Sequence, residues 1–172
     1  DGAVWHTENV DAAAQVGTYA AIAIAADGAV HIAYYDAAHQ DLKYARKGGG
    51  TWQIETVESA GDVGKSAAIA VDSSGRPHIA YYVDITGELH YAAYDGSSWQ
   101  IERVGSEMWV GSYASLALDV SGSPHIAYYD AGNGDLLYAY LDAGDWQVVR
   151  ADTGITDDVG RFVSLALDSA GR

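Results

Sequence analysis

The sequence predicts an all-β protein, a β-propeller built of four-stranded antiparallel blades. Three observations predict this fold: a repeat of about 47 residues, four short strand-like segments in each repeat, and turn residues between those segments. Tryptophan and histidine both recur at the interval of 47. The tryptophans are Trp5, Trp52, Trp99 and Trp146, and the histidines are His31, His78 and His125. A fixed period of this length is typical of repeat architectures.

The second repeat shows the four segments in order. They are 66–71, 77–82, 89–92 and 99–104. Most are rich in β-branched or aromatic residues, and turn residues such as the Gly of 72–75 and 95–98 separate them. Such runs are typical of strands and hairpins. No run of ten or more residues carries a convincing helical stripe with caps, so we expect no helix.

The size of the side chains changes along each repeat. The first segment carries small residues such as Ala67, Ala68 and Ala70, whereas the fourth segment begins with Trp. Propeller blades converge at the ring axis and spread at the rim, so small inner and large outer side chains favour this fold. The alternative is a β-solenoid, whose coil is usually shorter and has no such gradient.

The repeat also predicts the boundaries of the units. We expect a lone outer strand at about 1–15, blades at about 16–62, 63–109 and 110–158, and a lone inner strand at about 159–172. A closed propeller needs at least about four blades, and the repeat predicts only three complete ones here. We therefore expect further blades from the rest of a longer chain, or from another subunit, to complete the ring.

The amino-acid composition excludes several classes of function. The 172 residues include 24 acidic and 9 basic ones, for a net charge of −15, which does not suit a nucleic acid or an anionic membrane. The absence of cysteine excludes disulfides and thiolate chemistry. No apolar run approaches the ~20 residues of a membrane span, so we expect no membrane insertion. No signal peptide is visible in the chain.

One recurring string is specific. It is Leu-Asp-x-x-Gly-x-Pro-His-Ile-Ala-Tyr-Tyr-Asp at 118–130, with a looser copy at 71–82. The string resembles the repeats of bacterial extracellular β-propeller proteins, and it is distantly similar to the Asp-box repeats of sialidase-type propellers. The resemblance implies a propeller fold and an extracellular or cell-surface location. The Asp-box motif has an aromatic residue soon after its Gly, where this chain has Pro-His.

Residues shared by the repeats are expected to be structural. The three histidines lie on second strands, too far apart for one metal ion, and the tyrosine pairs put one ring on each face of a strand. The expected structural set is His31, His78, His125, Tyr35, Tyr82, Tyr129, Trp52, Trp99 and Trp146. No catalytic residue is predicted. The arginines fall near predicted turns or outer strands, so we expect surface residues and no sialidase-like arginine cluster.

Residues that depart from the repeat are the candidates for binding. Trp109 lies in a loop between a fourth and a first strand, and Asp36, Asp84 and Asp130 follow second strands. The connections there open on one face of a propeller. We predict that these four residues contribute to a ligand site, with a solvated acidic face as the alternative. No cofactor is expected. Calcium is the ion that such carboxylates would suit, although no complete calcium loop is present.

The leading hypothesis is a non-catalytic extracellular binding or scaffolding propeller for a glycan or a protein partner. The first alternative is part of a sialidase-like or polysaccharide-lyase-like enzyme, which would need paired acids or an arginine cluster in one cleft. The second alternative is a structural repeat of a surface layer or appendage.

Overall fold

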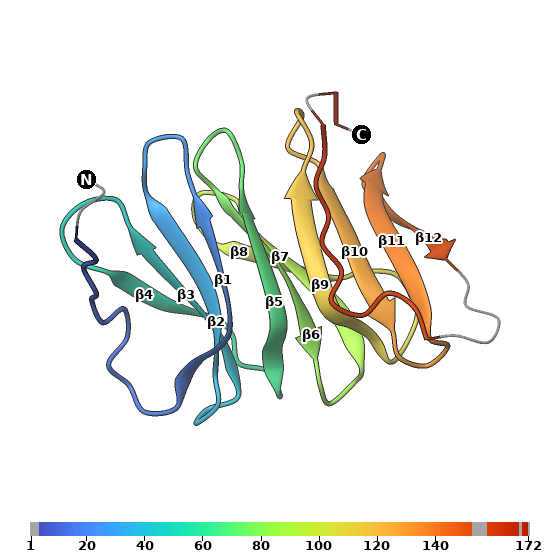
Figure 1. The fold of residues 1–172 in the computed structure, drawn as a ribbon, viewed down its shortest axis with the longest axis horizontal. Helices are drawn as coiled ribbons and strands as arrows, with labels where there is room; N and C mark the ends of the chain where they lie inside the picture. The colour runs from blue at the N-terminus through green and yellow to red at the C-terminus, as the bar shows by residue number, and fades with distance from the viewer. Residues whose placement is uncertain (1–3, 153–157, 169, 172) are drawn as a thin grey trace.

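The computed structural model describes residues 4–152, 158–168 and 170–171, and these form twelve strands with no helix. The strands make three separate four-stranded antiparallel sheets (Figure 1). The first sheet contains β1 (Val16–Ile24), β2 (Val30–Asp36), β3 (Asp41–Lys47) and β4 (Gln53–Glu58). The second contains β5 (Val63–Val71), β6 (Pro77–Val83), β7 (Glu88–Tyr94) and β8 (Trp99–Arg103). The third contains β9 (Val110–Leu118), β10 (Pro124–Asp130), β11 (Asp135–Asp142) and β12 (Asp145–Asp152). The all-β prediction is confirmed.

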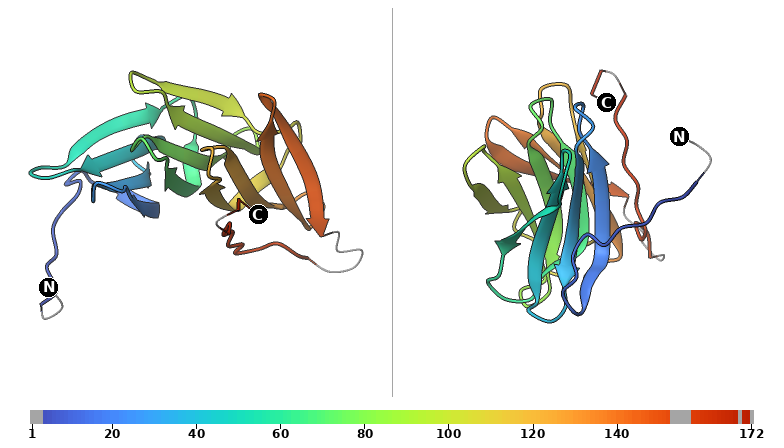
Figure 2. Two further views of the ribbon diagram at one scale, coloured as in Figure 1. Left: turned by 90° about the horizontal axis from the view of Figure 1, so that it is seen from above. Right: turned by 90° about the vertical axis from the view of Figure 1, so that its left-hand side faces the viewer.

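The three sheets stand face to face in an open arc (Figure 2). Their first strands β1, β5 and β9 pack against one another, and the fourth strand of each sheet forms its far edge. Trp52, Trp99 and Trp146 lie within one residue of the start of these far-edge strands, where the sequence places them. The arrangement is consistent with a propeller-like fold.

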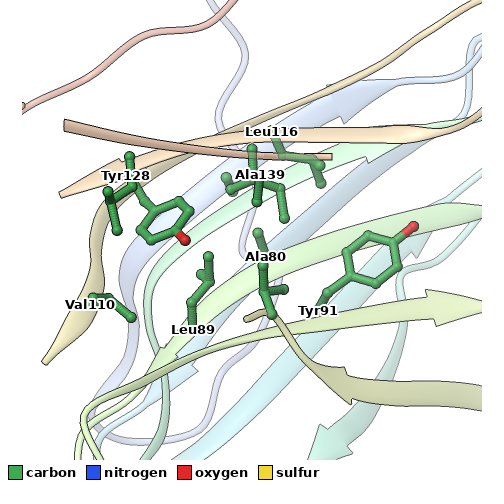
Figure 3. Packing of buried hydrophobic residues seen from close by; sticks show 11 residues of the cluster. Ala80, Leu89, Tyr91, Val110, Leu116, Tyr128 and Ala139 are labelled. Atoms are coloured by element: carbon green, nitrogen blue, oxygen red, sulfur yellow. The ribbon is translucent and has the colours of Figure 1, made fainter. Parts of the chain in front are cut away.

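Apolar side chains fill the gaps between neighbouring sheets. In the gap between the second and third sheets, Leu89 and Tyr128 are fully buried and pack with Val110, Leu116 and Ala139 (Figure 3). A similar cluster around Leu42 and Tyr81 fills the first gap. Small residues of the first strands lie at these gaps, as expected. Ala68 belongs to the cluster between the second and third sheets, and Ala70 packs against that cluster. Burial of these side chains is the main favourable term that holds sheet to sheet.

The Val-Gly pairs that open β5 and β9 have a packing reason. Gly64 and Gly111 have φ values of +102° and +100°, a conformation that favours glycine. A Cβ atom on Gly111 would lie 2.8 Å from the Cβ of Leu89, and one on Gly64 would lie 2.9 Å from the Cα of Leu42. Each glycine therefore lets a first strand approach the third strand of the preceding sheet, a contact we call the glycine clamp.

The two terminal segments differ from the expected lone strands. Residues 4–15 form no strand, and Trp5 is 98% exposed. Residues 158–168 are not assigned to a strand either, but the positive φ values of Gly160 and Phe162 repeat those found in a first strand. A Cβ atom on Gly160 would lie 2.9 Å from the Cα of Leu136. Phe162 has a positive φ, as Tyr113 has in β9. Among the described residues, neither segment has a hairpin partner with which it could form the backbone hydrogen bonds of a sheet. Residues 1–3, 153–157, 169 and 172 lie outside the description.

Candidate functional site

The three carboxylates predicted to bind a ligand lie at the ends of second strands, and each makes its own contacts with the protein. Asp36 and Asp130 are buried, and both cap the turns that follow their strands. Asp36 accepts hydrogen bonds from the backbone of Ala38 and His39 at 3.0 and 3.2 Å, and Asp130 accepts them from Gly132 and Asn133 at 2.9 and 3.1 Å. Their lone pairs are used by the protein itself, so these two carboxylates serve the fold.

Asp84 belongs to a surface ion cluster instead. Lys65 Nζ lies 2.7 Å from Asp84 and 2.8 Å from Asp62, and Asp62 also accepts a hydrogen bond from the hydroxyl of Tyr35 at 2.7 Å. Burial of Lys65 works to lower its pKa, but the two carboxylates outweigh burial and hold the pKa of Lys65 above its ordinary value. The cluster fixes the β4–β5 loop against β5 and β6.

Trp109 is 58% exposed and lies beside the β6–β7 turn, since a Cβ on Gly87 would come within 3.1 Å of its ring. Its carbonyl accepts a hydrogen bond from Ala131, in the turn that follows Asp130. Ile85, in the β6–β7 turn, and Met108 are also exposed, by 72% and 56%. We call this end of the sheets, marked by the three exposed apolar residues, the loop end.

The repeated histidines form a buried hydrogen bond inside each sheet. His31 Nδ1 lies 2.6 Å from the hydroxyl of Tyr44, on the neighbouring strand, and His78 and His125 make the same bond to Tyr91 and Tyr138. Burial is the main cause that lowers the pKa of His31 and His78. His31 and His78 are therefore neutral structural groups at pH 7. Within the described part of the chain, no group of three or more His, Asp or Glu residues is arranged to hold a metal ion.

A pocket lies between the first and second sheets, at the end of the strands opposite to the loop end. We call it the gap pocket, and its volume is about 370 Å³. It is lined by the ends of β3 and β4, by the β5–β6 turn and by the end of β7. The lining residues are Tyr44, Arg46, Gln53, Ile54, Glu55, Gly75, Arg76, Pro77 and Tyr94.

Two arginines reach the gap pocket from different sheets, and each is held by a carboxylate on a turn. Arg76 makes two contacts of 2.7 Å with Asp72, and Arg46 lies 3.7 Å from Asp27. Burial works to raise the pKa of Asp72, but the backbone and side-chain hydrogen bonds from Arg76 outweigh burial, so this pKa lies below its ordinary value. Asp72 is therefore an ionised anchor for Arg76 at neutral pH.

Acceptors and aromatic rings complete the gap pocket. Trp99 Nε1 donates a hydrogen bond of 3.1 Å to Glu55 Oε1 across the gap, which holds the carboxylate in place. The ring of Trp99 contacts Tyr44 edge-on at 5.3 Å and Tyr94 at 5.5 Å. The pocket thus combines guanidinium donors, a carboxylate and an amide with apolar walls, and this set can hold a polyhydroxylated molecule.

A second polar cluster spans the same gap, at the loop-end side. His90 on β7 lies 3.8 Å from Glu58 at the end of β4 and 3.4 Å from Glu88, which also pairs with Arg103 at 2.8 Å. Burial works to lower the pKa of His90, but Glu58 and Glu88 outweigh burial and raise the pKa.

The gap pocket was not predicted from the sequence. The sequence predicts surface arginines, and Arg46 and Arg76 are 39% and 48% exposed, but both also line one pocket. A signal was available, because both arginines depart from the repeat. Ala93 occupies the position of Arg46 one repeat later, and Ser123 occupies that of Arg76.

The sequence matches no protein-family model and no curated protein. Solved structures share the fold. A fucose lectin from Kordia zhangzhouensis in complex with methyl-fucoside matches 78% of this chain and 99% of its own, with 21% identity and a TM-score of 0.51. A protein of unknown function from Dyadobacter fermentans matches 78% of this chain, with 15% identity and a TM-score of 0.59.

A mutant of the Aleuria aurantia lectin, in complex with Fucalpha1-6GlcNAc, matches 76% of this chain with 18% identity and a TM-score of 0.51. The chain spans 51% of the Dyadobacter protein and 47% of the Aleuria lectin. The described part of the chain contains no helix able to cross a membrane. At these identities the likeness concerns the fold, an all-β and propeller-like one that two fucose lectins share.

Proposed function

We propose that the chain is a non-catalytic carbohydrate-binding module, extracellular or at the cell surface, that holds one neutral sugar in the gap pocket. The observation that carries this proposal is the convergence of Arg46, Arg76 and Glu55 on one pocket with aromatic and aliphatic walls. Sugar hydroxyls both donate and accept hydrogen bonds, so they match a site that offers guanidinium donors beside a carboxylate acceptor.

The charge of the gap pocket favours a neutral ligand. The positive charges of Arg46 and Arg76 face three negative ones, those of Glu55 and of the anchors Asp27 and Asp72. No excess positive charge is left for an anionic sugar. Each guanidinium has five N–H donors, and Arg76 uses two of its nitrogens on Asp72, which leaves donors for hydroxyl groups.

The size of the gap pocket suits a small ligand. Its volume of about 370 Å³ lies near the low end of the ~300–1,000 Å³ range of small-molecule sites, which fits one or two sugar units. Two of the similar structures are lectins crystallised with fucosides, which supports a sugar as the ligand and makes L-fucose the first sugar to test.

Isothermal titration calorimetry with a sugar panel tests the proposal. The panel is L-fucose, D-galactose, D-mannose and D-glucuronate. We expect one neutral sugar to bind, and Arg46→Ala and Arg76→Ala each to weaken it about tenfold or more, the effect of losing a hydrogen bond to a charged group. Arg150→Ala is the control, because Arg150 pairs with Asp135 and does not line the pocket.

Two outcomes would contradict the proposal. One is the absence of binding to any neutral member of the panel. The other is a preference for D-glucuronate, which would show that the pocket acts as a cationic site despite Glu55 and the anchors Asp27 and Asp72.

A second candidate ligand site is the loop end, for a sugar or a protein partner. Ile85, Met108 and Trp109 are all exposed there, and exposed apolar clusters often mark interaction sites. The Trp109→Ala variant described in the Discussion distinguishes the loop end from the gap pocket.

A further inference from the structure

We infer that Arg46 and Arg76 decide which intersheet gap of this chain binds a sugar, so that the first gap binds and the second gap does not. The inference rests on the proposed function. It concerns two gaps that both lie within the described residues and that share the same strand register.

The two gaps are equivalent in register. Arg46 pairs with Gln53 across β3 and β4, and Ala93 pairs with Gln100 across β7 and β8. In the same way, Tyr44 pairs with Glu55, and one repeat later Tyr91 pairs with Glu102. The following turn also repeats, because Pro77 pairs with Val71 and Pro124 with Leu118.

The side chains of the second gap keep the acceptors of the first gap and lose its donors. Gln100, Ile101, Glu102 and Pro124 repeat Gln53, Ile54, Glu55 and Pro77. Both arginines, however, are replaced by residues without charge, Ala93 and Ser123, and Leu141 takes the place of Tyr94. The second gap therefore presents a carboxylate and an amide with no cation opposite them.

The carboxylates that hold the two arginines also differ between the gaps. Asp27, which lies beside Arg46, corresponds to Ser74 in the next repeat. Asp72 and its counterpart Asp119 both accept backbone hydrogen bonds within their own turns. Asp72 also pairs with the side chain of Arg76, whereas Ser123 stands at the equivalent position beside Asp119. An arginine-holding arrangement thus exists at the first gap only, among the two gaps that the structure describes.

The acceptor is also held differently in the two gaps. Glu55 receives the indole N–H of Trp99 at 3.1 Å. In the second gap Trp146 packs on Tyr91 at 5.3 Å, as Trp99 packs on Tyr44, yet its buried Nε1 has no hydrogen-bond partner. Glu102 is therefore not fixed by the tryptophan. A preorganised carboxylate binds better than one that must be ordered by the ligand.

Exchange of the two gaps tests the inference, again by calorimetry with the sugar panel. The loss variant, R46A together with R76S, gives the first gap the residues of the second. The graft variant carries S74D, A93R, S123R and L141Y, which copy Asp27, Arg46, Arg76 and Tyr94 into the second gap. Circular dichroism and thermal unfolding verify that both variants fold, as expected for substitutions at partly exposed positions.

We expect the loss variant to bind the preferred sugar at least about tenfold more weakly, and the graft variant to raise the number of sites per chain from one to two. If wild type binds a sugar and the loss variant binds it equally well, the inference is wrong while the proposed function stands. If the graft variant still has one site, the arginines do not decide between the gaps. If wild type binds no sugar of the panel, both fall.

Discussion

Trp99 and Glu55 join two neighbouring sheets by a hydrogen bond of 3.1 Å from the indole Nε1 to a carboxylate oxygen. Trp99 begins the far-edge strand of the second sheet, and Glu55 lies on the far-edge strand of the first. A residue that recurs for a structural reason thus also fixes an acceptor of the gap pocket.

The Trp99→Phe variant is expected to bind sugar about fivefold more weakly, because a hydrogen bond of this kind contributes about 1 kcal/mol. Trp146→Phe is a matched control, since Trp146 packs on Tyr91 as Trp99 packs on Tyr44 but makes no hydrogen bond through Nε1. Calorimetry should show an unchanged affinity for this control. Equal losses in the two variants would assign the effect to packing.

The glycine clamp gives a stability prediction. Gly111→Ala should lower the free energy of unfolding by about 2–5 kcal/mol, the sum of the strain of a positive φ and of overpacking against Leu89. Gly122→Ala is the control, because its φ of +85° carries similar strain but no atom lies within 4 Å of the added Cβ. We expect that variant to lose only about 1–2 kcal/mol. Urea denaturation measures both, and equal losses would contradict the clamp.

The pKa of His90 predicts a pH dependence. Its pKa in the folded protein is raised above the ordinary value of ~6.5, so the protonated form stabilises the fold. That contribution is complete below pH ~6.5 and is lost as the pH rises through the folded pKa. The pKa values of Glu58 and Glu88 are lowered, with hydrogen bonds outweighing burial at Glu58, so both partners stay charged throughout this range.

His90→Leu should therefore reduce the free energy of unfolding more at pH 6 than at pH 9. Leucine is a reasonable substitute because Leu137 occupies the same position one repeat later. The difference between wild type and variant is the quantity to measure, since His31 and His78 have lowered pKa values and give the opposite slope. A difference that does not change with pH would refute the role of His90.

Trp109→Ala separates the loop end from the gap pocket. Trp109 is largely exposed, so we expect its removal to lower the free energy of unfolding by about 1 kcal/mol or less. The affinity for sugar should not change, because the gap pocket lies at the opposite end of the strands. Loss of sugar binding in this variant, with the arginine variants unaffected, would instead place the ligand at the loop end.

The repeat allowed much of the fold to be predicted. The spacing of 47 gave the strand order and the far-edge tryptophans, because each repeated position has one structural role. The terminal segments were not predicted as well. Trp5 matches Trp52 in sequence, but residues 4–15 have no neighbouring strand in the described structure to pair with, and pairing is a tertiary property.

The candidate site was harder to predict, because it forms across a gap. Arg46 and Arg76 lie 30 residues apart in the sequence. They line one pocket only because the end of β3 faces the β5–β6 turn of the next sheet. The acidic residues present a different difficulty. Asp36 and Asp130 lie in acidic loops of a kind that can bind ligands, but their carboxylates also accept hydrogen bonds from the backbone of their own turns. Sequence composition does not distinguish these two roles.

The glycine clamp also bears on how such a chain can lengthen or vary during evolution. β5 and β9 take their positions from the sheet before them, at Leu42 and Leu89, and Gly160 makes the same contact at Leu136. A change in the length of the loop before the clamp therefore does not alter where the glycine packs. The two additional residues between Trp146 and Val159 are an example of such a change. Gene duplication could add whole units without disturbing those already present, and each new gap would be free to acquire or lose arginines independently.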